Sequence, residues 1–546
     1  MKILTRLTIL IISSVLLLNC TKPFKYAGIN VNEEVFKYGV TFQFCNAGDT
    51  TVLPQYDIFV KISGRDANSI YDFNGNKSFG ALRGIMNVGL DPKRLPTVAN
   101  PVSFVLEVYG PDYLPVKIPV IIDGSLRQQR VLVTLVDIKR PPKGVAIYQF
   151  PTMGVNAQGA LNSTQIISST INSSTPEDVT ITIPAGTKFL DGNGNVILPQ
   201  SAGDSVSGLI AFFSTRTAYA MSSFPGGSVM ADTIVTPSGK IAGFHQSAGM
   251  VYLEMTLGGK DVKSFSNPIS YNVTMDPNFI SASTSSPVAS GDILYVWNFD
   301  YSKNRWDYIV NDTISYVGGT LRGTFSTTKL KFNSLSWVTP RCTQTTSLTI
   351  KNNIYLGTSY LIDILSQNGD KKHPLVAGLF VEVPFTGTVI KNVPMPTGPV
   401  EIRVYENSLD NSQYNYFTRR RPPVAVYSGN ACGDNIVLNI NNPQDMQWHY
   451  FNVVGYCSNS YYYVYPSIPT FYKFANAKVN YSLLGSVHIG KFSTTNLKIN
   501  TDYHFAWIAG QDLFTKEKLI DSSSYVRSIV VPETFPGDTL RNLWCY

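Results

Sequence analysis

Polar and apolar residues alternate with a period of two along much of the chain. From Val102 to Val108 every second residue is apolar, and the same alternation recurs at 179–183, 269–275 and 400–404. Because successive side chains of a strand point to opposite faces, this pattern is typical of antiparallel sheets with one face in a core and the other in water. Turn sequences such as Asn74-Gly75 separate the runs, and no amphipathic helix exceeds three turns. We therefore predict an all-β chain of tandem β-sandwich domains.

The domain borders are predicted from linkers. A length of 546 residues favours three or four domains. Two Arg-Pro-Pro sequences, at 140–142 and 421–423, each lead into a Val-Ala-x-Tyr segment, and paired prolines stiffen a linker. We place borders near 140, 341 and 422. The expected parts are a leader at 1–19 and domains at 20–140, 141–341, 342–422 and 423–546.

The first twenty residues have the layout of an export signal. Lys2 and Arg6 precede an apolar stretch from Leu7 to Leu18 that is too short to span a membrane, and Cys20 follows. This start resembles the signal peptide and lipobox of bacterial lipoproteins, although Asn19 replaces the usual small residue. The resemblance implies acylation of Cys20, a membrane partner through a lipid anchor, and an outer-membrane location in either leaflet. The alternative is an ordinary secretory signal with an incidental cysteine.

Composition and charge argue against a disordered chain and against a nucleic-acid partner. The chain has 15% charged and 12% aromatic residues, the opposite of a disordered chain, and a net charge of +7. No stripe of basic residues with interleaved aromatics is found, so we expect no nucleic-acid partner.

The second block, at 141–341, carries a family resemblance. Ile183-Pro184-Ala185-Gly186-Thr187 comes first, and Trp297, Trp306 and Trp337 mark the end of the block. The order resembles an extracellular β module of large Bacteroidota envelope proteins, with Lys331 where that module has histidine. The resemblance implies a non-catalytic module in which the three tryptophans are structural.

Two further blocks resemble known sandwiches. Residues 343–420 resemble the carboxypeptidase regulatory-like, or prealbumin-like, fold. The sequence Leu497-x-x-x-Thr501-x-Tyr503 is similar to the tyrosine corner of fibronectin type III and immunoglobulin-like domains, where the Tyr hydroxyl bonds back to the chain. Tyr503 is therefore expected to be structural.

No reaction chemistry is recognised in the sequence. The five histidines form no HExxH motif, and neither a GxSxG elbow nor a phosphate-binding loop is present. Two calcium-like loops, beginning at Asp72 and Asp191, lack the glutamate at position twelve. We expect no catalytic residue, no metal and no cofactor. A weak hydrolase or an accessory part of a hydrolase system stays open, because a carboxylate pair across a cleft leaves no sequence signature.

An aromatic segment is the candidate ligand platform. Exposed aromatic rows stack on sugars or anchor protein partners, whereas buried ones belong to a core. We predict a non-enzymatic binding or adhesion protein for a glycan or an envelope protein, with a structural spacer of the envelope as an alternative. The candidates are Trp448, Tyr461, Tyr463, Tyr465 and Tyr472.

A disulfide is expected between Cys432 and Cys457. If the strands 436–440 and 449–453 form a hairpin in which Ile440 faces His449, the two cysteines are also opposed, at a distance that suits a disulfide. Cys342 with Cys545 is the weaker second pair, and Cys45 is expected to be free.

Overall fold

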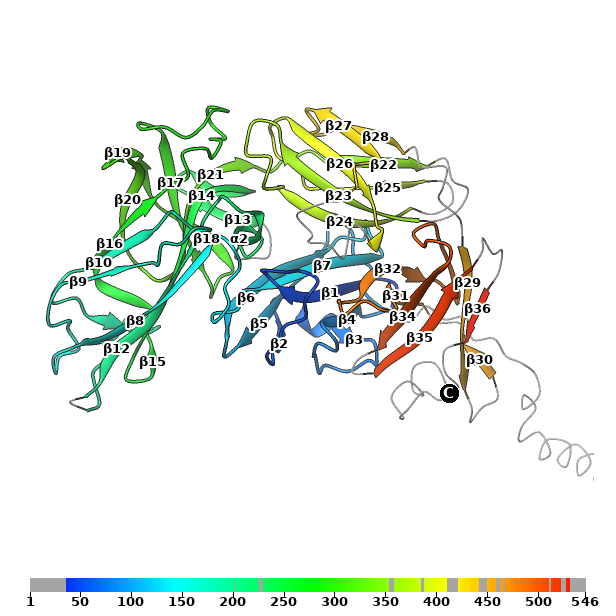
Figure 1. The fold of residues 1–546 in the computed structure, drawn as a ribbon, viewed down its shortest axis with the longest axis horizontal. Coiled ribbons are helices and arrows are strands. Elements are labelled where there is room, and N and C mark those ends of the chain that lie inside the picture. Colours follow the sequence, from blue (N-terminus) through cyan, green and yellow to red (C-terminus); the bar gives the residue numbers. More distant parts are fainter. Residues whose placement is uncertain are drawn as a thin grey trace, which may run out of the picture.

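The computed structural model describes residues 36–201, 203–224, 229–352, 358–383, 387–409, 421–440, 449–457, 462–464, 467–509, 512–521 and 527–530. Strands dominate these residues and pair into eight sheets, which form tandem β-sandwiches as predicted (Figure 1). No helix in the described part of the chain is both long and apolar enough to cross a membrane.

The first domain packs two sheets, in the orders β3-β4-β1-β7 and β2-β5-β6, around one core. Most neighbours are antiparallel, but β1 and β7 run parallel. The elements are β1 (Gly39–Asn46), β2 (Phe59–Ser63), the 3-10 turn η1 (Ala67–Ser69), β3 (Ile70–Asp72), β4 (Ile85–Leu90), β5 (Val102–Gly110), β6 (Tyr113–Ile122) and β7 (Gln128–Leu135).

The second domain is the largest, and its two sheets enclose the core that contains Val179, Ile181 and Ile183. One sheet has the order β19-β20-β16-β10-β9 with β11 beside β16, and the other has the order β13-β18-β17-β21-β14-β12-β8 with β15 beside β14. The elements are β8 (Val145–Gly154), β9 (Gln165–Ser168), β10 (Val179–Ile183), β11 (Phe189–Leu190), β12 (Ser205–Phe213), α2 (Ala218–Met221), β13 (Met230–Thr236), β14 (Gly239–Leu257), β15 (Lys260–Asp261), β16 (Ser264–Thr274), β17 (Ile293–Asp300), β18 (Arg305–Thr313), β19 (Ser315–Val317), β20 (Thr320–Lys329) and β21 (Lys331–Pro340).

The third domain contains the sheets β25-β22-β28 and β24-β23-β26-β27. Its last two strands lie beyond residue 422, where the sequence predicted a border. Because β27 pairs with β26 and β28 pairs in parallel with β22, they complete this sandwich, and the domain extends to Ile440. The elements are β22 (Ser347–Asn352), β23 (Thr358–Ser366), β24 (Val376–Val383), β25 (Thr388–Ile390), β26 (Val400–Glu406), β27 (Ala425–Gly429) and β28 (Asn435–Ile440).

The fourth domain contains the sheets β30-β29-β33, with β36 beside β29, and β32-β31-β34-β35. The elements are β29 (His449–Cys457), β30 (Tyr462–Val464), β31 (Ile468–Phe474), β32 (Ser482–Val487), β33 (Lys491–Thr494), β34 (Thr501–Ala509), β35 (Asp512–Ile520) and β36 (Arg527–Val530).

The predicted Cys432–Cys457 disulfide is wrong. Cys432 is bonded to Cys342, with their Cα atoms 5.5 Å apart. The expected hairpin does not form, because β28 pairs with β22 whereas β29 pairs with β30, β33 and β36 of another domain. The same bond excludes a Cys342–Cys545 pair. Cys45 is free, as predicted, and burial raises the pKa of its thiol to about 12.

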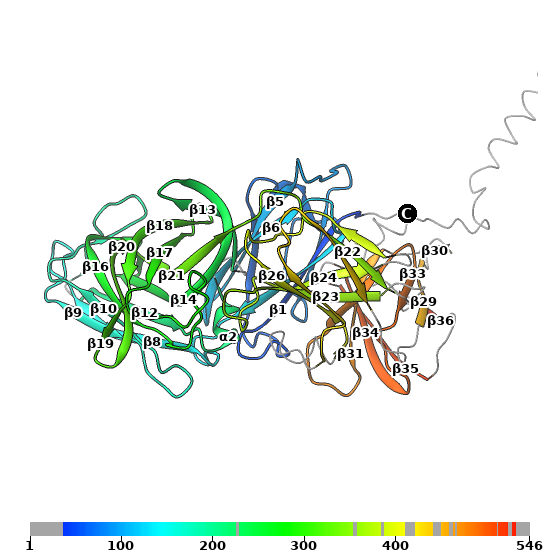
Figure 2. The ribbon, with the colours of Figure 1, turned by 90° about the horizontal axis from the view of Figure 1, so that it is seen from above.

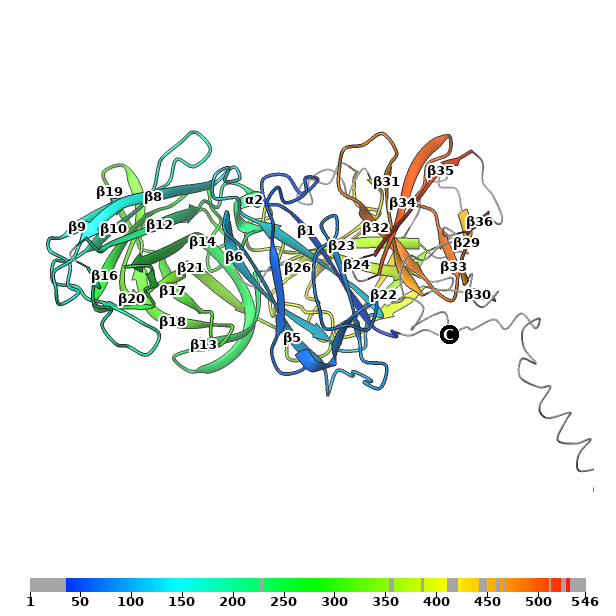
Figure 3. The ribbon, with the colours of Figure 1, turned by 90° about the horizontal axis from the view of Figure 1, so that it is seen from below.

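The first, third and fourth domains share an additional apolar core. Ile85 comes from the first domain, Leu361 and Phe380 from the third, and Phe471 and Leu483 from the fourth. Figures 1 and 2 show these domains side by side, with the second domain at the far end of the molecule. Figure 3 shows the same arrangement from below, opposite to the view of Figure 2. Three sandwiches therefore meet along one buried seam.

Candidate functional site

A cavity of about 620 Å³ opens where the first, third and fourth domains meet. This volume is in the range of small-molecule sites in proteins. The first domain contributes Tyr38, residues 124–127 and Gln128 at the start of β7. The third domain contributes parts of β23, β24 and β25, and the fourth contributes parts of β29, β32 and β33. The lining residues are Tyr38, Gly124, Ser125, Leu126, Arg127, Gln128, Thr358, Ser359, Glu382, Val383, Thr388, Tyr450, Leu484, Gly485, Ser486, His488, Lys491, Phe492 and Ser493.

Buried hydrogen bonds hold the walls together. The hydroxyl of Ser359 on β23 donates to the carbonyl oxygen of Leu484 on β32, at 2.7 Å, and so joins the third domain to the fourth. The amide of Asn87 on β4 donates to the carbonyl oxygen of Ile508 on β34, at 2.9 Å, and joins the first domain to the fourth. An unmade buried hydrogen bond is expensive, so these contacts favour one relative placement of the domains.

Among the described residues that line the cavity, Glu382 is the one acidic residue. One of its carboxylate oxygens, Oε1, accepts a hydrogen bond from the backbone amide of Ser486, and the other, Oε2, lies 3.8 Å from Nε2 of His488. Gly485 permits this approach, because a Cβ there would lie 2.8 Å from the Phe492 ring and 3.1 Å from Glu382 Oε1. The carboxylate is therefore fixed against the fourth domain.

A tight turn presents two polar side chains to the cavity. His488 and Lys491 are the ends of the turn, and each donates its backbone N–H to the other's carbonyl oxygen, at 2.9 and 3.0 Å. Between them, Ile489 has a φ of 49° and Gly490 a φ of 71°. Two consecutive positive φ values are typical of a type I′ hairpin turn. A β-branched residue rarely adopts this conformation, so Ile489 is strained, and such strain concentrates at functional sites.

The lining combines aromatic rings with many hydrogen-bonding groups. Tyr38 and Tyr450 are half-buried, and burial raises the pKa of the Tyr450 hydroxyl. Ser125, Thr388 and Ser493, which carry hydroxyl groups, also line the cavity. A ring face accepts the apolar side of a sugar while neighbouring polar groups bond its hydroxyls. The cavity therefore offers both aromatic faces and hydrogen-bonding groups to a ligand.

The predicted aromatic platform does not match this site. Tyr472 is fully buried, and its hydroxyl donates to the carbonyl oxygen of Asn407 at 2.9 Å, so its assignment to a ligand surface is wrong. The reason is that β31 lies inside a sheet between β32 and β34, where Tyr472 faces the core. Tyr463 lies in β30, but its side chain is outside the described residues, as are Trp448, Tyr461, Tyr465 and the lipidation candidate Cys20.

The predicted structural aromatics are buried. Trp297, Trp306 and Trp337 all lie in the second domain's cores, and the indole N–H of Trp297 donates to the carbonyl oxygen of Ser336 at 3.1 Å. The Tyr503 hydroxyl accepts a hydrogen bond from the backbone N–H of Lys498 at 2.9 Å, which confirms that it bonds back to the chain.

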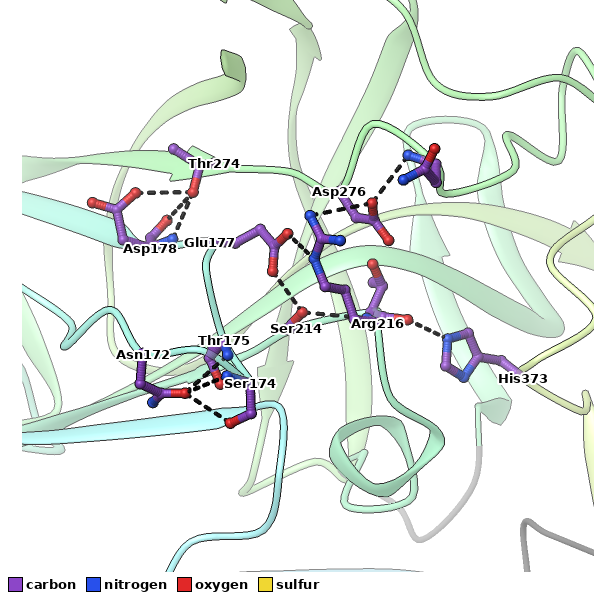
Figure 4. A network of polar contacts seen from close by, with 12 residues as sticks. Asn172, Ser174, Thr175, Glu177, Asp178, Ser214, Arg216, Thr274, Asp276 and His373 are labelled. Carbon is purple, nitrogen blue, oxygen red and sulfur yellow. Dashed lines mark hydrogen bonds and ion pairs between the residues drawn. The ribbon is translucent and has the colours of Figure 1, made fainter. Parts of the chain in front are cut away.

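A polar cluster lies between the second and third domains (Figure 4). Arg216 pairs with both Glu177 and Asp276, and Ser214 donates to Glu177 at 2.8 Å. From the third domain, Nε2 of His373 donates to the carbonyl oxygen of Thr215 at 2.7 Å. Because the arginine compensates both acids, we interpret this cluster as a structural joint. Nowhere in the described ranges do three or more metal-ligating side chains gather in a group that could hold an ion.

Sequence reasoning missed the cavity. Arg127, Glu382 and Lys491 line it from three domains, and each is unremarkable in its local sequence. The one local signal was the Ile489-Gly490 pair in a short link between two strands, which marks a turn but not a site.

Comparisons with known proteins give no family. No protein-family model matches the chain, and no curated protein matches it. Among solved structures, the shaft pilin SpaA from Lactobacillus rhamnosus GG is 13% identical, with a TM-score of 0.15, over 35% of this chain and 98% of that one. A membrane-associated protein of unknown function from Bacteroides fragilis is 10% identical, with a TM-score of 0.15, over 55% and 98%. The major pilin BcpA from Bacillus cereus is 8% identical, with a TM-score of 0.13, over 91% and 99%.

Proposed function

We propose that the protein is a non-enzymatic, lipid-anchored binding protein of the bacterial outer membrane that holds a glycan in the cavity between its first, third and fourth domains. The observation that carries the proposal is the cavity itself. It is large enough for one or two sugar rings, and it combines aromatic faces with hydroxyl, amide and charged groups. The shared core beside it fixes its walls before any ligand arrives, which lowers the entropic cost of binding.

The test is a glycan array with the chain from residue 23 onward, followed by calorimetry on each hit. Tyr450→Ala removes one half-buried ring from the cavity, and Tyr316→Ala removes an exposed tyrosine of the second domain as the matched control. An aromatic contact contributes about 1 kcal/mol, so Tyr450→Ala should weaken binding roughly fivefold. An unchanged affinity would place the ligand elsewhere.

The lipid anchor rests on the sequence of the first twenty residues. In cells, Cys20→Ala should abolish palmitate labelling and move the protein from the membrane fraction to the soluble fraction. Labelling that persists in the variant would contradict the anchor.

The alternative functions predicted from the sequence, a structural spacer and a hydrolase, give different results in the glycan-array experiment. A structural spacer would bind no glycan on the array. A hydrolase would cleave a glycan that it binds, and an accessory component would stimulate such cleavage by its partner enzyme. Analysis of the glycan products for each array hit would detect either outcome.

A further inference from the structure

A cavity of about 10 Å³ lies in the joint between the second and third domains. This volume admits one water molecule at most. His245 on β14 lines it from the second domain, and Asp370 and His373, in the loop between β23 and β24, line it from the third. The loop packs closely on β14, because a side chain at Gly369 would collide with Gln246. The joint therefore encloses two histidines from different domains with almost no room for water.

His373 is held in one protonation state by its contact across the joint. Its Nε2 atom donates to the carbonyl oxygen of Thr215 at 2.7 Å, and its Nδ1 atom is buried without a hydrogen-bond partner among the described residues (Figure 4). A carbonyl oxygen only accepts, so the proton is on Nε2 and the neutral ring leaves Nδ1 bare. A second proton would create a buried, charged N–H with no acceptor among those residues, which is costly.

His245 has the same property on the other side of the cavity. Its Nδ1 atom lies 2.8 Å from Ser336 Oγ, and its Nε2 atom is buried without a partner in the described part of the chain. The ring lies against Phe224 and Trp306, and these neighbours replace water around it. Burial therefore lowers the pKa of His245 to about 3, and burial also lowers the pKa of His373.

The charged groups around the histidines offset only part of this cost. Asp370 raises the pKa of His373 and Lys372 lowers it, and burial outweighs the effect of the acid. For His245 the cause of the shift is burial. Neutral histidines therefore suit the joint better than protonated ones. Further charges near the joint are engaged in ion pairs, namely Arg216 with Glu177 and Asp276, and Lys371 with Glu401.

From this arrangement we infer that the joint is a pH-sensitive contact, closed while His245 and His373 are neutral and loosened when they take up protons. Water that enters the loosened joint hydrates the new charges, so each ring there has a pKa nearer the ordinary 6.5. The closed joint is most stable above that pH. Below it, the ratio of closed to loosened molecules falls by up to about tenfold per pH unit for each histidine.

Hydrogen exchange of the chain from residue 23 onward, read by mass spectrometry near pH 7 and near pH 5, tests the inference. The rates are corrected for the intrinsic effect of pH on amide exchange. Amides of residues 214–224 and 367–376 should exchange about tenfold faster near pH 5, whereas those of β10 and β34 should keep their protection. Equal protection of the joint at both pH values overturns the inference. An acid effect that reaches β10 to the same extent also overturns it, because the whole second domain is then unfolding.

Variants assign the effect to the histidines. His373→Gln keeps a side-chain N–H for the Thr215 carbonyl oxygen but cannot be protonated, so most of the acid effect should disappear. Asp370→Asn keeps the oxygen that accepts the Lys372 amide but removes the charge that favours a protonated ring, so the joint should loosen further near pH 5. His504→Gln, in the fourth domain, is the matched control and should leave the acid effect unchanged.

An acid effect that persists in full in His373→Gln overturns the inference. If that variant has already lost the protection of the joint near pH 7, Asp370→Asn decides the matter. Loosening near pH 5 equal to that of the wild type would then overturn the inference, and greater loosening would support it.

Discussion

The backbone amide of Ser486 in the fourth domain donates a hydrogen bond to the Glu382 carboxylate in the third. The bond crosses the wall of the cavity, next to the shared core that contains Phe380 and Leu483. It connects two sandwiches through one side chain.

Replacing Glu382 by alanine should loosen the third and fourth domains from one another. The Ser486 amide loses its acceptor, and an unsatisfied, partly buried donor costs about 1–3 kcal/mol. Denaturant unfolding of the full chain measures the loss. Glu382→Gln keeps an acceptor oxygen and is the control, which should lie closer to the wild type. Equal stability of the alanine variant and the wild type would contradict the role of this bond.

Relieving the strained turn should stabilise the fourth domain. Ile489 adopts a φ of 49°, a conformation that costs a residue with a Cβ roughly 1–2 kcal/mol. Ile489→Gly should therefore raise the free energy of unfolding by about 1 kcal/mol, after the greater entropy of the unfolded glycine chain is subtracted. Ile489→Val keeps the β-branch and should bring no such gain. The comparison requires only melting curves of the three proteins, and a glycine variant no more stable than the valine variant would be inconsistent with strain.

Acid should weaken the second domain through His245. This imidazole is buried against Trp306 and Phe224, and burial lowers its pKa to about 3. The unfolded chain binds a proton near the ordinary pKa of 6.5, so stability is complete above that pH and falls as the pH drops towards 3. Near pH 5 the loss from this residue is about 2 kcal/mol.

Unfolding at a series of pH values measures that slope. His245→Gln should be less stable at pH 7 but should lose less stability on acidification than the wild type. The matched control is His504→Gln, which makes the same substitution at a histidine on β34 of the fourth domain. A wild-type slope that persists in His245→Gln would assign the acid sensitivity to other groups.

Removing the Cys342–Cys432 bond should destabilise the third domain strongly. The bond joins residues separated by 90 positions, for which the chain-entropy model gives about 4–5 kcal/mol. Non-reducing peptide mapping should recover the two cysteines in one cross-linked peptide, and Cys342→Ser should lower the unfolding midpoint. Reductant should not lower that midpoint further in the variant. A Cys432 peptide joined to another cysteine would exclude the observed pairing.

Local sequence patterns predicted the sandwiches because the alternation of apolar and polar residues in a strand shows which of its faces is buried. The alternation at Val179, Ile181 and Ile183 is the inward face of β10, and all three side chains are fully buried. The bond that Tyr503 makes to Lys498 was likewise predictable, since it joins residues five apart in one motif.

Pairings between distant segments could not be predicted in this way. β28 follows Cys432 and precedes a turn-rich segment, so a hairpin with β29 was the simplest interpretation, yet its partner is β22, with Ser347 opposite Asn435. The cavity could not be predicted either, because its walls come from three domains that are distant in the sequence and form it only when they pack together. A sequence pattern predicts which face of a strand is buried, but it does not identify the strand or domain that packs against that face.

The Cys342–Cys432 bond also has a mechanical consequence. With the proposed lipid anchor at one end and a bound polymer pulling on it, the protein would feel tension along its chain. The bond shortens the path of that tension by the 90 positions between the two sulfurs. At about 3.4 Å per extended residue, roughly 300 Å of chain would remain closed in the disulfide loop even if the sheets of the third domain unfolded. Reduction would release this length, so the oxidation state of one bond determines how far the unfolded third domain can extend.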